Sequence, residues 1–96
     1  MVGGPMANHG DIKLVNNCNI ASAEALAHQL EELFRTGAPV DIDASEVERI
    51  DTAAAQILYS FFVSMQQSGL QVVLQRPSEA FIECVTRLGL KSYFEN

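Results

Sequence analysis

Basic residues are scarce in this sequence. Its 96 residues include six Lys and Arg against twelve Asp and Glu, which gives a formal net charge of −6 at pH 7. Phosphate binding needs a cationic surface, so this balance argues against nucleic acid as a partner. The six cations also form no patch along the chain. They are Lys13, Arg35, Arg49, Arg76, Arg87 and Lys91.

Cysteine and long apolar runs are equally scarce. Cys18 and Cys84 have no C-x-x-C spacing, so neither a zinc site nor a redox pair is indicated. No apolar run approaches the ~20 residues that span a bilayer, and no signal-peptide pattern is present. We therefore expect a soluble, cytoplasmic protein with two reduced, partly buried thiols and no direct membrane insertion.

Motifs of catalysis and cofactor binding are missing. The sequence contains neither a P-loop nor the glycine pattern of dinucleotide-binding folds. His9 and His28 are not placed near a Ser or Cys in a way that indicates a triad. No catalytic residue, cofactor or metal site is predicted, and the protein is not expected to be an enzyme. A small-ligand pocket stays open as an alternative.

The composition is that of one folded domain. With 48% hydrophobic and 19% charged residues, the chain can build a single core. Residues 1–10 contain three Gly and one Pro without periodicity. They are predicted to be a disordered N-terminal arm or an expression-vector remnant, and residues 11–96 are predicted to form the domain.

Strand and helix patterns alternate along this domain. Residues 11–15, the short segment with Val40 and Ile42, and residues 70–75 read as strands, and residues 18–20 as a short return strand. Each of three helical stretches follows a capping residue and ends at a Gly. These pairs are Ser22 and Gly37, Asp51 or Thr52 and Gly69, and Ser78 and Gly89.

This order of elements predicts the fold class. Successive strands joined by helices run parallel, with right-handed crossovers. We expect an α/β fold, a single small domain with a mixed, mostly parallel β-sheet packed with helices. Leu90, Tyr93 and Phe94 are expected to fold back as a terminal patch over the sheet or an exposed edge.

The second helix carries an unusually wide apolar stripe. A core helix explains most of this pattern, and a partner-binding flank at the helix start is the alternative interpretation. The stripe consists of Ala54, Ile57, Leu58, Phe61, Phe62 and Met65, widened by Tyr59 and Val63.

Carboxylates gather just before this helix. Five lie within eleven positions, and clustered carboxylates can bind a hard cation. The spacing fits no EF-hand, so an acidic rim that attracts a basic partner is the favoured interpretation. The five are Asp41, Asp43, Glu46, Glu48 and Asp51.

Thr52 is the candidate for modification. Capping of the helix is its simplest role. A phosphate there would add ~1.5–2 negative charges at a helix N-terminus and would change the charge of a docking surface while the fold survives.

The sequence resembles the STAS domain, the module of anti-sigma-factor antagonists, over roughly residues 12–94. Residues 43–54 resemble the family's Asp-Leu-Ser and Asp-Ser-Ser-Gly signature, residues 69–74 its next strand, and residues 88–90 its Leu-Gly-Leu. The family's phosphorylated Ser falls on Thr52, and the second Ser and the Gly fall on Ala53 and Ala54. An Asp-Thr-Ala start is more similar to STAS subunits of bacterial lipid-transport ABC complexes and to STAS proteins of chemotaxis-like clusters.

The resemblance implies a non-enzymatic interaction module in bacterial signal transduction. Its partner would be an anti-sigma or kinase-like regulator, with Thr52 as the phosphoacceptor candidate. The alternative is an ABC subunit that binds its ATPase constitutively, and a homodimer is left open. The predicted partner-binding residues are Glu46, Glu48, Asp51, Thr52, Ala53 and Gln56.

Overall fold

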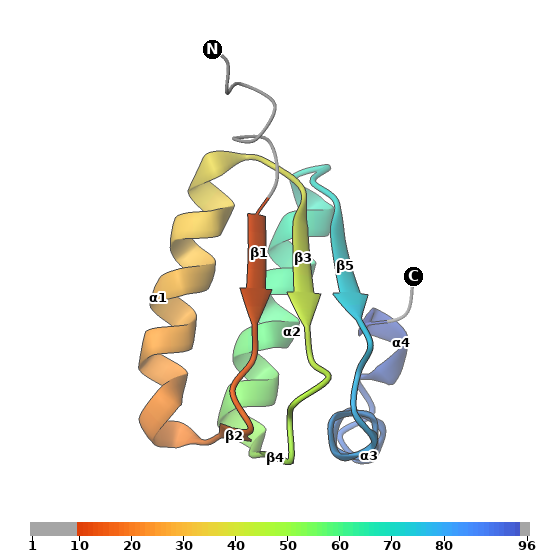
Figure 1. Ribbon diagram of the computed structural model, residues 1–96. Helices are drawn as coiled ribbons and strands as arrows, with labels where there is room; N and C mark the ends of the chain where they lie inside the picture. The colour runs from red at the N-terminus through yellow and green to blue at the C-terminus, as the bar shows by residue number, and fades with distance from the viewer. Residues whose placement is uncertain (1–9, 95–96) are drawn as a thin grey trace.

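Three parallel strands form the sheet on which the molecule is built. The computed structural model describes residues 10–94 and arranges the strands in the order β1-β3-β5 (Figure 1). They are β1 (Gly10–Lys13), β3 (Val40–Asp43) and β5 (Val72–Gln75). The predicted α/β fold is confirmed, and the strand pairs among the described residues are parallel.

The first strand begins earlier than predicted. Gly10, assigned to the arm from sequence, is the first residue of β1, and its N–H donates to the Pro39 carbonyl at 2.9 Å. Val15, assigned to the strand, lies beyond it and is exposed. The other nine residues of the predicted arm lie outside the described residues.

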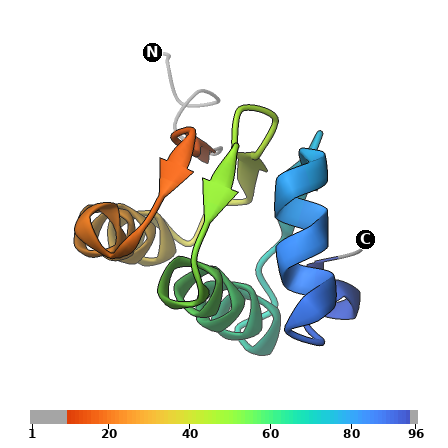
Figure 2. The same cartoon turned by 90° about the horizontal axis from the view of Figure 1, so that it is seen from below.

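The two faces of the sheet differ in chemistry. Ile12 pairs with Ile42, and both are buried under the helices. Lys13 pairs with Asp43, and because side chains alternate along a strand, these two point to the other face. Figures 1 and 2 show α1 and α2 on one side of the sheet, and no helix of residues 10–94 covers the opposite side.

Four helices complete the described fold. α1 (Ile20–Thr36) and α2 (Thr52–Gln67) lie side by side behind the sheet, and α3 (Glu79–Arg87) and α4 (Lys91–Phe94) lie toward β5 (Figures 1 and 2). Within residues 10–94, none of these helices combines the length and apolar character needed to cross a bilayer.

A second, very small sheet joins the starts of α1 and α2. β2 (Asn17–Cys18) pairs in parallel with β4 (Arg49–Ile50), with Cys18 opposite Ile50. The Cys18 carbonyl accepts a hydrogen bond from the Asp51 N–H at 3.0 Å. The predicted return strand at 18–20 is therefore wrong, because β2 pairs with a strand thirty-two positions later in the chain and not with β1.

The N-cap of α1 also differs from the prediction. The cap is Asn19, whose side chain accepts from the Ser22 N–H at 3.1 Å, while the Ser22 hydroxyl accepts from the Asn19 N–H at 3.1 Å. Ser22 is thus the third helical residue in a capping box. The buried apolar stripe does not extend into the first turn of α1, where Ile20 is 73% exposed. The stripe therefore could not locate the first residue of the helix.

The other helix boundaries agree with the sequence. Of the two candidates for the α2 cap, Asp51 is the cap. Ser78 caps α3 by accepting from the Phe81 N–H at 3.2 Å, as predicted. Gly69 follows α2 with a φ of 71°, in the left-handed region where a glycine is favoured.

The core lies between the sheet and the helices. The predicted stripe of α2 supplies much of it, with Ile57 only half-buried at the side facing α1. The fully buried residues of α2 and the strands include Val40, Ile42, Ala54, Leu58, Phe62 and Met65.

The C-terminal apolar patch packs mainly on α2 and α3. Phe94, which is 4% exposed, packs edge-on against Phe62 at 4.7 Å and Phe81 at 5.5 Å between ring centroids. Of the residues expected to cover the sheet or an exposed edge, Phe94 contacts α2 and α3 and also lines a hollow with Leu74 of the edge strand β5.

We predict that Phe94→Ala lowers the free energy of unfolding by about 3–5 kcal/mol, because it leaves a cavity between α2 and α3. Tyr93→Ala is the matched control, since Tyr93 is 43% exposed and contacts Tyr59 at the surface. Urea denaturation followed by circular dichroism measures both variants. Equal losses for the two would contradict the packing of α4 described above.

Candidate functional site

The start of α2 is capped by Asp51 and leaves Thr52 exposed. The Asp51 side chain accepts a hydrogen bond from the Ala54 N–H at 3.0 Å. Thr52 is the first helical residue, and its hydroxyl makes no hydrogen bond to another residue of 10–94. The capping role that the sequence left open between the two therefore belongs to Asp51, and the Thr52 hydroxyl faces solvent.

This helix start is held firmly against the core. Ile50 precedes it in β4, and the Asp51 N–H bonds to the Cys18 carbonyl at 3.0 Å. Ala54 and Ala55 are fully buried beneath the first turn, so larger side chains have no room there. The exposed Thr52 thus sits on a rigid support.

Both cysteines are buried and free. Burial raises the pKa of the Cys18 thiol, and the Asp51 carboxylate adds to that shift. Burial likewise raises the pKa of Cys84. Because the thiolate is the reactive form, the raised pKa values disfavour reaction at these two buried thiols.

The loop between β3 and β4 is anchored to the start of α3. Val47 is buried, and its carbonyl accepts a hydrogen bond from the Ser78 hydroxyl at 2.6 Å. The Ser78 N–H donates to the Ala44 carbonyl at 3.1 Å. These bonds hold the backbone on which Glu46 and Glu48 project to solvent on either side of Val47.

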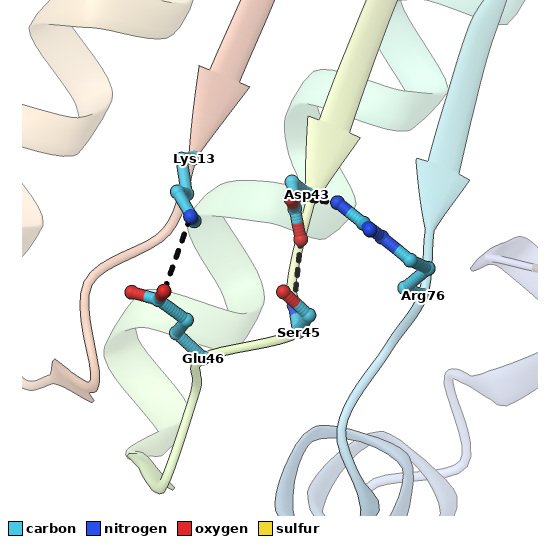
Figure 3. Close-up of polar contacts among 5 residues, drawn as sticks. All are labelled: Lys13, Asp43, Ser45, Glu46 and Arg76. Carbon is cyan, nitrogen blue, oxygen red and sulfur yellow. Dashed lines mark hydrogen bonds and ion pairs between the residues drawn. The ribbon is translucent and has the colours of Figure 1, made fainter.

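Ion pairs cross the ends of the three main strands. Figure 3 shows Lys13 reaching Glu46 at 3.1 Å and Arg76 reaching Asp43 at 2.7 Å. The Ser45 N–H also donates to Asp43, at 2.8 Å. Exposed pairs such as the first contribute up to about 1 kcal/mol, so their main effect is local charge neutralisation.

The predicted acidic rim is therefore not one continuous anionic surface. Asp43 and Glu46 are paired with cations, Asp51 caps α2, and Glu48 is exposed. Within residues 10–94, no group of three or more His, Cys, Asp or Glu is arranged to hold a metal ion.

Asp43 is the most strongly perturbed carboxylate of this region. Hydrogen bonds from the Ser45 side chain and backbone, together with the Arg76 guanidinium, lower its pKa from 3.8 to about 2. Arg76 adopts a φ of 46°, which is uncommon for a residue with a side chain. The contact with Asp43 at 2.7 Å helps to hold this backbone conformation.

The residues predicted to bind a partner divide between two hollows. Glu46 and Glu48 line one hollow, together with Glu79 at the start of α3. Ala53 and Gln56 line the other, which lies between α1 and α2. Asp51 and Thr52 lie between these two pairs in the chain.

Helix α1 supplies a wall of the second hollow that the sequence did not assign to the site. Ala27, Glu31 and Phe34 line it, opposite Ala53 and Gln56. The sequence did contain a pattern from which the contact between α1 and α2 could be predicted. Two successive right-handed strand–helix–strand crossovers on one face of a sheet place their helices side by side. The apolar stripe of α1 is also wide enough to extend beyond the sheet.

Comparison with known families decides the class of the protein. The sequence matches the family model described as "Mlab, STAS domain" over residues 6–94. The chain belongs to the STAS domain family. STAS domains are generally non-enzymatic modules for protein interaction or regulation. No curated protein matches the sequence.

The STAS signature can now be placed on the fold. Ala54, at the signature's Gly position, is fully buried, so a small side chain is required there. Ala53, at the position of the second Ser, is half-buried and faces α1. Thr52, at the position of the phosphorylated Ser, is exposed.

We predict that Asp51→Ala lowers the free energy of unfolding by about 0.5–2 kcal/mol, because the Ala54 N–H loses its acceptor. Thr52→Ala should change it by less than about 0.5 kcal/mol, since its exposed hydroxyl bonds to nothing described. Chemical denaturation of both variants measures the difference. The reverse order of losses would assign the cap to Thr52.

We also predict that the Asp43 carboxylate titrates at about pH 2 in the folded protein. Because its pKa is lowered on folding, its stabilising contribution is complete above about pH 4 and is lost as the pH falls through about 2. Carbon-detected NMR of the Asp43 carboxyl group measures the midpoint. Ser45→Ala should raise the midpoint, whereas an unchanged midpoint would remove the assigned cause.

Proposed function

We propose that this STAS domain is a non-enzymatic module that docks a cytoplasmic protein partner through the 44–48 loop and the start of α2. The observation that supports this most is the exposed Thr52 on a capped, core-anchored helix start. A surface that is already ordered costs little conformational entropy on binding. The exposed carboxylate of Glu48 favours a partner with a basic group opposite it, whereas Glu46 is already paired with Lys13.

Phosphorylation of Thr52 would act on docking and not on folding. The phosphate would add about −1.5 to −2 charge at the positive end of the α2 dipole. Asp51 already occupies the Ala54 N–H there, so the phosphate would meet a neighbouring carboxylate and remain directed to solvent. The docking surface would become more anionic while the exposed side chain leaves the core unchanged.

A second candidate function is a constitutive subunit of a bacterial lipid-transport ABC complex that binds the ATPase. It is favoured by the Asp51-Thr52-Ala53 start, which lacks the signature's second Ser. In that version Thr52 contacts the ATPase without modification. The same corner of the domain carries both candidates, and they differ in the partner and in the need for a phosphate.

We predict that Thr52→Glu weakens partner binding by more than about tenfold, equivalent to about 1.4 kcal/mol, because a charge enters the contact. The measurement is titration calorimetry with two purified proteins of the same organism, a kinase-like regulator and an ABC ATPase subunit. Thr86→Glu is the matched control, because Thr86 is exposed on α3. The partner affinity of Thr86→Glu should stay within roughly twofold of the affinity of the unmodified chain.

Mass spectrometry after incubation with the regulator and ATP separates the two candidates. Phosphate on Thr52 supports the regulated module. Binding of the ATPase without phosphate, lost in Thr52→Glu, supports the transporter subunit. Unchanged affinity of both partners for Thr52→Glu would place docking elsewhere and overturn the proposal.

A further inference from the structure

An apolar groove runs between α1 and α2 on the side away from the sheet. We call it the α1–α2 groove. Its volume is about 510 Å³. Ala27 and Phe34 line it from α1, and Ile57 and Phe61 from α2, with Glu31 as the ionisable group among its lining residues.

We propose that this groove receives an amphipathic helix of the protein partner, with a Lys or Arg of that helix opposite Glu31. The inference rests on the proposed function and deepens it, because it names the partner's element and chemistry. Three independent features of the groove carry it: its shape, its charge and its continuity with the Thr52 corner.

The shape is that of a helix-binding trough. Along α2 the lining residues run from Ala53 to Ser64, which at ~1.5 Å per residue is about 16 Å, or three helical turns. Along both helices they recur at three- and four-residue spacing. Side chains at this spacing form the ridges between which the side chains of another helix pack. Ala27 and Ser60 are small and allow close approach.

The charge at the groove favours a partner helix that carries a Lys or Arg. Glu31 is exposed and forms no ion pair with another residue of 10–94. No Lys or Arg is among the residues that line the groove. The whole chain carries a formal charge of −6. An apolar helix with a Lys or Arg on its flank matches this surface, whereas an acidic helix would be repelled.

The groove is continuous with the proposed docking corner. Ala53 and Gln56 line its end nearest to Thr52 and also belong to the predicted partner-binding set. A helix lying in the groove would therefore end beside Thr52. One partner could cover both surfaces, and their contributions can be separated by substitution.

The test blocks the groove with Ser60→Arg and compares it with Gln66→Arg. Both positions are exposed on α2, but Gln66 does not line the groove. Titration calorimetry uses whichever of the two purified partners, the ABC ATPase subunit or the kinase-like regulator, binds the unmodified chain. Ser60→Arg should weaken binding by more than about tenfold, and Gln66→Arg by less than roughly twofold.

A charge reversal provides the second arm. Glu31→Lys and Glu24→Lys change the net charge equally and lie on the exposed side of α1, but only Glu31 lines the groove. Glu31→Lys should weaken binding by about fivefold or more and reduce its salt dependence, while Glu24→Lys should act within roughly twofold. If both substitutions weaken binding equally, the effect comes from the net charge of the domain and not from a contact with Glu31. That result would overturn the assignment of Glu31. Thermal unfolding of every variant checks that the fold is intact.

The outcomes separate this inference from the proposed function. If Thr52→Glu weakens binding but Ser60→Arg equals Gln66→Arg, the groove is not used and the proposed function stands. If Ser60→Arg weakens binding and Thr52→Glu does not, the groove is supported and the Thr52 corner is excluded. If sedimentation shows a dimer that only Ser60→Arg dissociates, a second copy fills the groove and the inference is overturned. If neither partner binds, the proposed function fails with it.

Discussion

The pairing of β2 with β4 is the contact on which the arrangement of the site depends. It joins only two residues of each strand, yet Cys18 and Ile50 lie opposite one another immediately before the two helix caps. The hydrogen bond from the Asp51 N–H to the Cys18 carbonyl at 3.0 Å closes this junction. As a result α1 and α2 begin at the same end of the molecule (Figure 1). The α1–α2 groove lies between them.

The proposed docking corner combines a rigid backbone with a chemically simple surface. Ala54 and Ala55 are fully buried and pack the first turn of α2 against the core. The Asp51 side chain accepts a hydrogen bond from the Ala54 N–H of this turn. The groups that this corner presents are the hydroxyl of Thr52, the small apolar side chain of Ala53 and the amide of Gln56. Such a surface can distinguish partners by shape and by the presence or absence of charge, which suits a STAS interaction module.

The polar face of the sheet has a different character. There the strand ends carry their own counterions, with Arg76 on Asp43 and Lys13 on Glu46 (Figure 3). The acidic run in the sequence therefore does not translate into one acidic surface. Asp41 and Asp43, two positions apart in β3, lie on the same face and line one hollow with Asp11. Asp51 is separate from them because it lies at the start of α2.

Local chemistry by itself determined the α/β class, the strand that contains Val40 and Ile42, the buried stripe of α2 and the cap at Ser78, and it narrowed the cap of α2 to Asp51 or Thr52. Each of these follows from periodicity or from a side chain that bonds within a few residues. The position of Phe94 between α2 and α3 and the α1–α2 groove were decided only by the tertiary structure. Each depends on which distant surface lies opposite, and that is set by strand pairing across more than thirty residues.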